Sequence, residues 1–161
     1  MKVEGKDYRT VWMQGSTVQM IDQRLLPHRF EIIDLPTHVE TAHAIADMAI
    51  RGAGAIGATG AYGMAQAALQ APRDVEGFSR HVELAAEVLR GTRPTAQNLF
   101  YAVDLVLDAA RAELPSLDAA RDAAVTAAEM VADQDADYCR RIGEHGEGLI
   151  GEGWGISTHC N

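Results

Sequence analysis

Cysteine is scarce in this chain: Cys139 and Cys160 are the two among its 161 residues. They have neither the paired spacing of a zinc site nor the number that a disulfide framework needs. His38 and His43 are five residues apart, so they do not stack on one helical face as ligands. We therefore expect no metal, and free thiols in a reducing compartment, the cytoplasm.

Basic residues and long apolar runs are also few. The chain has 14 Lys and Arg against 23 Asp and Glu, a net charge of -9, whereas proteins that follow a nucleic-acid backbone present a basic face to it. No stretch approaches the roughly 18 to 20 apolar residues of a membrane span, and no apolar secretory region follows the polar start. Neither nucleic acid nor a membrane is an expected partner, and any phosphate would have to be bound by local geometry.

The chain is 47% hydrophobic but only 6% aromatic, with abundant Ala and Gly, which favours closely packed helices over an aromatic β-sandwich. Within residues 1–36, β-prone runs at 8–13 and 17–22 flank a turn at 14–16 and predict a hairpin, and a third run covers 30–35. We expect a small antiparallel sheet here.

Residues 37–149 read as a helical bundle. Thr37 is placed to cap a first helix whose apolar residues have helical spacing. Further helices are predicted at 55–69, 75–89, 96–114 and 117–142, separated by turn signals at 71–74, 91–94 and 115–116. The fold class is α+β, a sheet followed by a bundle.

The last residues, 150–161, are predicted to be a linker and the first strand of a Rossmann-like α/β domain that is mostly absent from this chain. A glycine-rich segment, 143–155, leads into a strand at Ile156, and Cys160 follows that strand. Open α/β sheets place ligands at the carboxyl ends of their strands, which favours a functional thiol. An inert buried thiol is the commoner fate of a free cysteine and remains the alternative.

An arginine lies beside three glycines in the segment 51–57. Gly52, Gly54 and Gly57 match the dinucleotide fingerprint literally, but a helical pattern precedes them where that fingerprint requires a strand. If a helix begins near Gly54, its unpaired amides and the guanidinium of Arg51 could hold an anion. The alternative is that small residues let two helices approach closely and Arg51 is solvated.

A second arginine, Arg93, precedes Pro94, which we expect to be the first residue of the next helix, with Thr92 or Arg93 at its cap. Arg93 would then meet another positive helix end, unless it pairs with a surface acid.

An acidic segment offers Asp133, Asp135, Asp137 and Glu144 at calcium-loop spacing, but Tyr138 occupies the position where the sharp turn needs glycine. The alanine-rich context predicts continuous helix with a solvated acidic face instead.

Three segments in order resemble the methylthioribose-1-phosphate isomerases of the initiation factor 2B alpha/beta/delta-like family: Arg51-Gly52-Ala53-Gly54-Ala55-Ile56-Gly57, Thr92-Arg93-Pro94-Thr95-Ala96-Gln97-Asn98-Leu99 and Thr158-His159-Cys160-Asn161. Residues 18–27 also look like the opening strand and turn of these enzymes, so the chain resembles their N-terminal half. Two residues depart from the family pattern: Gly54 stands where proline is typical, and Thr92 where serine is common.

The resemblance implies conversion of 5-methylthioribose 1-phosphate to 5-methylthioribulose 1-phosphate in methionine salvage, without a cofactor, and for some relatives also a reaction of 5-deoxyribose 1-phosphate. It makes Cys160 an acid–base residue, together with an aspartate outside this chain. Arg51, the amides of Gly52 and Ala53, and Arg93 match phosphate and sugar contacts.

The resemblance also implies two protein partners, the C-terminal half of the same protein and a second copy in a homodimer. Two alternatives stay open. A ribose-1,5-bisphosphate isomerase is disfavoured by the N-terminal hairpin, and a non-catalytic sugar-phosphate-binding regulator like the initiation-factor subunits is disfavoured by the thiol of Cys160.

Overall fold

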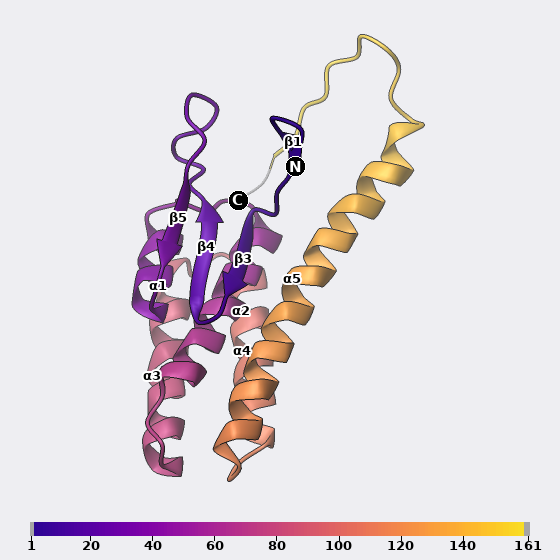
Figure 1. Cartoon of the computed structure of the whole chain (residues 1–161). Coiled ribbons are helices and arrows are strands. Elements are labelled where there is room, and N and C mark those ends of the chain that lie inside the picture. Colours follow the sequence, from indigo (N-terminus) through magenta and orange to yellow (C-terminus); the bar gives the residue numbers. More distant parts are fainter. Residues whose placement is uncertain (1, 160–161) are drawn as a thin grey trace.

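The computed structural model describes residues 2–159 as a small sheet packed on a helical bundle (Figure 1). A short hairpin, β1 (Lys2–Val3) and β2 (Lys6–Asp7), precedes a three-stranded antiparallel sheet. The strands of that sheet are β3 (Val11–Gln14), β4 (Thr17–Ile21) and β5 (Ile32–Leu35), in the order β3-β4-β5. The predicted hairpin and third strand are therefore confirmed.

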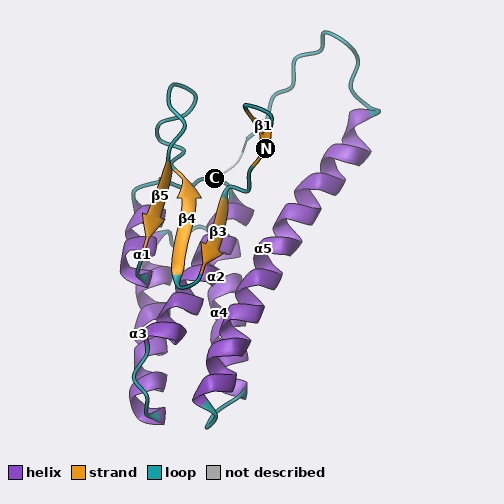
Figure 2. Cartoon of the chain, in the orientation of Figure 1, coloured by secondary structure: helices purple, strands orange, loops and turns teal. Residues whose placement is uncertain are grey.

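The two faces of this sheet differ, as strand alternation requires. Val18 and Met20 of β4 are fully buried beneath it. Between them, Gln19 accepts a hydrogen bond from the Trp12 indole and donates one to Asp34, at 2.8 and 2.7 Å. The strands lie against the bundle on one side only (Figure 2), and the buried residues of sheet and helices form one core.

Five helices follow: α1 (His38–Ala46), α2 (Ala53–Gln70), α3 (Val75–Thr92), α4 (Gln97–Ala112) and α5 (Leu117–Glu147). The cap predicted at Thr37 is present as a capping box, in which Thr37 accepts from the amide of Glu40 and the Glu40 carboxylate accepts from that of Thr37. The α+β fold class is confirmed. No helix in the described part of the chain is long and apolar enough to span a membrane.

Glycines let α2 approach α4. A Cβ on Gly57 would lie 3.0 Å from the Asn98 carbonyl oxygen, and one on Gly60 would overlap Cδ1 of Leu99. The start of α2 therefore lies beside the start of α4, and the two helices run parallel.

The helix α5 packs along α2 in the opposite direction. Tyr62, in the middle of α2, donates a hydrogen bond to Glu129 of α5 at 2.8 Å, and Arg121, near the start of α5, donates one to the carbonyl of Ala71 at the end of α2. The two helices are therefore antiparallel.

Three predicted boundaries were wrong. The structure extends α3 to Thr92, whose hydroxyl donates to the carbonyl of Leu89, and begins α4 only at Gln97. Pro94 thus follows a helix instead of opening one. It cannot continue α3, and the residue before a proline favours extended backbone, as at Arg93 (φ -144°, ψ 86°).

The other two boundaries lie near the end of the chain. The helix α5 continues through 143–147, part of the segment expected to be a connection, and its last turns extend beyond the other helices (Figure 1). Between residues 150 and 159 the structure has no strand, so the strand expected at Ile156 is not formed. A strand exists through pairing, and no neighbouring strand pairs with this part of the chain.

Candidate functional site

The start of α2 exposes unpaired backbone amides. Gly52 occupies the cap position with a φ of 97°, a conformation that strongly favours glycine, and no side chain caps the helix. The first helical hydrogen bond runs from the amide of Ile56 to the carbonyl of Gly52. The amides of Ala53, Gly54 and Ala55 come before it and have no partner within the helix, so this terminus has the polarity that binds anions.

Arg51 precedes this turn and is held by its backbone. Its amide donates to Oε1 of Gln23 at 2.9 Å, and the amide of Gln23 donates to the carbonyl of Ala49. Ile50 is fully buried, whereas Arg51 is exposed, and its guanidinium has no ion pair within residues 2–159. A free cation therefore lies next to the amides of α2.

Arg93 lies at the C-terminal cap of α3, where the chain turns toward α4. Its Nη1 atom is buried and has no hydrogen-bond partner in the part of the chain that the structure describes. A buried nitrogen of a guanidinium without an acceptor is costly, and an anion would remove that cost. The start of α4 also lacks a side-chain cap at Ala96.

The contact between Gly57 and Asn98 brings these groups to one end of the bundle. Two parallel helices place their positive termini there, one following Arg51 and the other following Arg93. We call Arg51, Gly52, Ala53 and Arg93 the candidate anion site. The helix starts that follow Arg51 and Arg93 thus lie side by side, and the close helix approach offered as the alternative reading of the glycines is what brings them together.

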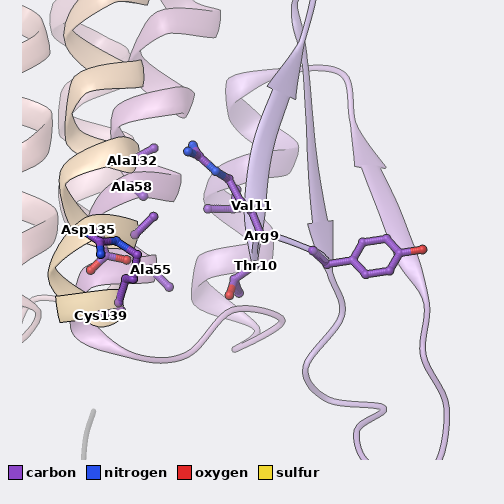
Figure 3. Close-up of a pocket in the computed structure, with 11 residues that line it drawn as sticks. Arg9, Thr10, Val11, Ala55, Ala58, Ala132, Asp135 and Cys139 are labelled. Atoms are coloured by element: carbon purple, nitrogen blue, oxygen red, sulfur yellow. The ribbon is translucent and has the colours of Figure 1, made fainter. Parts of the chain in front are cut away.

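Beside the start of α2, a cavity of about 310 Å³ lies between α2, α5 and the segment leading into β3 (Figure 3). Its lining residues are Tyr8, Arg9, Thr10, Val11, Ala55, Ala58, Ala132, Asp135, Ala136, Cys139 and Arg140. The residues from α2 are small and apolar, and those from α5 bring a carboxylate and a thiol. The cavity therefore has one wall that is part of the first turns of α2.

Asp135 and Cys139, one helical turn apart, line this cavity. Burial raises the pKa of the Asp135 carboxyl above its ordinary value. Burial, and then the charge of Asp135, raises the pKa of the Cys139 thiol, which favours its protonated form. The nearby guanidinium of Arg9 pairs with Asp133 at 2.6 Å, and this hydrogen bond raises the pKa of Arg9.

Sequence reasoning missed the cavity, since it treated Asp135 as part of a solvated acidic face. A signal existed: Ala132, Asp135, Ala136 and Cys139 recur at three- and four-residue spacing and so share one helical face.

Cys160, the expected acid–base residue, lies outside the described residues. The acidic segment Asp133 to Glu144 is continuous helix, as predicted, and no group of three potential metal ligands occurs among residues 2–159.

A family model described as "Initiation factor 2 subunit family" matches residues 49–161. The chain belongs to this family. It is 40% identical over 161 residues to the methylthioribose-1-phosphate isomerase of Thermosynechococcus vestitus, covering 98% of this chain and 45% of that protein. The chain thus spans less than half the length of the curated relative that it matches.

Two solved structures of similar architecture agree with this family membership. The 5-methylthioribose 1-phosphate isomerase of Pyrococcus horikoshii OT3 superposes with a TM-score of 0.86 at 37% identity, over 92% of this chain and 42% of that one. The delta subunit of translation initiation factor eIF-2B from A. fulgidus gives 0.83 at 36% identity, over 91% and 43%. Family members with this fold therefore carry both an enzyme's name and a translation factor's name.

Proposed function

We propose that this chain is the N-terminal, phosphate-binding portion of a methylthioribose-1-phosphate isomerase. The observation that carries the proposal is the candidate anion site, in which two parallel helix starts have no side-chain cap. Within residues 2–159 the guanidinium of Arg51 has no ion pair, and Nη1 of Arg93 has no hydrogen-bond partner. A phosphate monoester matches these groups in charge and in its number of acceptor oxygens. The relatives named for this activity support the choice of substrate.

The proposed reaction moves a hydrogen without a net change in atoms. A proton is delivered to the ring oxygen as the bond from C1 to that oxygen breaks, and a hydrogen moves from C2 to C1. The C2 hydroxyl releases its proton to the protein, which restores the proton first delivered and leaves a ketone at C2. The anion site would hold the phosphate on C1 while this occurs, with the amides of Gly52 and Ala53 and the guanidiniums of Arg51 and Arg93 as donors. Fixing the reacting carbons in this way lowers the barrier by orientation.

Cys160 is proposed as an acid–base residue in these steps. A thiol in an apolar environment stays protonated near neutral pH and can donate. The second acid–base group would come from the remainder of the protein, which we propose as a partner of this chain.

Apolar side chains on the last turns of α5 and the segment that follows support such a partner. Ile142, Leu149, Trp154 and Ile156 are each 69 to 78% exposed. We expect the C-terminal half to cover them, and we expect the assembled protein to be a cytoplasmic homodimer, as the family resemblance implies.

A hybrid enzyme tests the proposal, with this chain replacing the matching segment of the Thermosynechococcus vestitus relative. The hybrid is incubated with 5-methylthioribose 1-phosphate and followed by ³¹P and ¹³C NMR. We expect the ketose resonance to appear with the hybrid and not with its Cys160→Ser variant, while both bind the substrate. Turnover that survives in the variant would remove Cys160 from the mechanism.

The same experiment addresses a non-catalytic alternative, which the similarity to the eIF-2B delta subunit favours. Saturable substrate shifts at Gly52 and Ala53 without any turnover by the hybrid would make this chain part of a sugar-phosphate sensor. Absence of both binding and turnover would refute the proposed function altogether.

A further inference from the structure

A carboxyl group occupies the space that Gly54 leaves open. A Cβ at Gly54 would overlap Oδ1 of Asp135 and lie 2.6 Å from its Cγ. The Asp135 carboxyl therefore lies against the first turn of α2, on the cavity side of that turn. Any side chain larger than glycine at position 54 would displace it.

No cation pairs with Asp135 within the described part of the chain. Arg9, across the cavity, is paired with Asp133 at 2.6 Å, and Arg140 is paired with Asp137 and Glu144, each at 2.6 Å. Asp135 instead lies against Gly54 in the first turn of α2, a helix end whose dipole favours negative charge.

The other titratable groups facing this cavity are few. Tyr8 and Arg9 come from the segment before β3, and Cys139 and Arg140 come from α5. The residues that α2 contributes, Ala55 and Ala58, carry no charge. None of these groups forms an ion pair with the partly buried carboxyl in the described part of the chain, and burial holds its pKa above the ordinary range.

Amides of this same helix start belong to the candidate anion site, whose residue Ala53 directly precedes Gly54. A negative charge on Asp135 and a negative charge at Gly52 and Ala53 would share one helix terminus. Two negative charges at the same helix terminus repel each other, and water screens this repulsion less inside a protein than in solution.

We propose that Asp135 tunes the affinity of the anion site: its carboxyl group lies against Gly54 in the first turn of α2, and its charge opposes a dianion bound at that turn. This inference rests on the proposed function, because it takes the anion site as its starting point. By linkage, an anion bound at Gly52 and Ala53 makes Asp135 hold its proton more tightly, and protonation of Asp135 makes the anion bind more tightly.

Sulfate is the probe for the test, because it remains a dianion throughout the pH range used. The carboxyl ¹³C resonance of Asp135 and the amides of residues 52–55 are followed by NMR in the full 161-residue chain, from pH 4.5 to 8, with and without sulfate. We expect sulfate to raise the Asp135 titration midpoint and to bind about three- to tenfold more tightly at pH 4.5 than at pH 8.

Three variants separate the contribution of Asp135 from that of net charge. At pH 8, Asp135→Asn should bind sulfate more tightly than the parent does, and its affinity should change less with pH. Gly54→Ala retains the Asp135 carboxyl but pushes it away from α2. This variant should lower the titration midpoint of Asp135 and make sulfate affinity depend less on pH. Asp122 is an exposed acid on the same helix, so Asp122→Asn changes the net charge by the same amount and should bind sulfate as the parent does. If Asp135→Asn fails to fold, Gly54→Ala decides the test.

Two outcomes would overturn the inference, and they differ in what else they overturn. If sulfate shifts the amides of Gly52 and Ala53 while the Asp135 midpoint stays in place, the coupling is refuted and the anion site stands. If sulfate shifts neither those amides nor the midpoint, the coupling and the anion site of the proposed function are refuted together.

Discussion

Replacing Gly60 by alanine should destabilise this protein, although alanine is the better helix former. Gly60 lies in the middle of α2, where an added Cβ would overlap Cδ1 of Leu99 and approach Cγ2 of Val103 at 3.5 Å. Leu99 and Val103 are both fully buried in α4. The methyl group therefore cannot be accommodated by turning a side chain into solvent.

The magnitude follows from two opposing effects. Alanine gains about 1 kcal/mol over glycine in a helix interior, while overpacking a buried contact costs about 1 to 3 kcal/mol. We expect a net loss of about 1 kcal/mol in the free energy of unfolding. Gly91, near the end of α3, has no heavy atom within 4 Å of an added Cβ, so Gly91→Ala should gain about 0.5 kcal/mol.

Thermal and urea unfolding of the two variants, monitored by circular dichroism, measure this difference. A gap of about 1.5 kcal/mol corresponds to about 3 to 6 °C in Tm for a chain of this size. Both variants gain helix propensity, so the gap isolates the contact with α4. If Gly60→Ala were as stabilising as Gly91→Ala, the close approach of α2 and α4, and with it the placement of Arg51 near Arg93, would be wrong.

Three other predictions concern single polar side chains. Tyr62→Phe removes the 2.8 Å hydrogen bond to Glu129 and should lower the free energy of unfolding by about 1 to 2 kcal/mol in urea titrations; an unchanged midpoint would contradict the bond. Burial lowers the pKa of His81 below its ordinary 6.5, so the unfolded chain binds that proton more tightly. Stability should be complete above about pH 6.5 and fall as the pH drops below it, with a smaller fall in His81→Gln. Because burial and the charge of Asp135 raise the pKa of the Cys139 thiol, iodoacetamide should alkylate Cys139 about two- to threefold faster in Asp135→Asn at pH 7.5, by peptide mass spectrometry; equal rates would exclude that charge effect.

The parts of the fold that were predictable from sequence are those with local chemical signals. Thr37 and Glu40 form the capping box that begins α1, and Ser116 caps α5 by accepting from the amide of Ala119. Pro94 was misread because proline is common both at the first position of a helix and just after a helix ends. In the structure the Thr92 hydroxyl donates to the carbonyl of Leu89 within the last turn of α3, so Pro94 follows the end of a helix.

The residues of the candidate site could be picked out from the sequence, but their positions relative to one another in the fold could not. Small residues at Gly57 and Gly60 indicate that some helix comes close, yet they do not say that it is α4. Likewise, the contact between Gly54 and Asp135 joins two segments that no local pattern connects. The spacing of Ala132, Asp135, Ala136 and Cys139 marks one face of α5, but that α2 lies opposite this face follows only from the packing of the two helices.

The net negative charge of the chain makes the contact between Gly54 and Asp135 important for anion binding. With a net charge of -9, the protein as a whole repels a phosphate, but at 0.1 M salt such repulsion is screened beyond about 10 Å. Acids on distant surfaces therefore have little effect on an anion at Gly52 and Ala53. Asp135 lies against the same helical turn and is partly shielded from solvent, so its charge is not screened in this way. The ionisation of that single carboxyl, opposed by Arg51 and Arg93, should decide how tightly this acidic chain holds an anion.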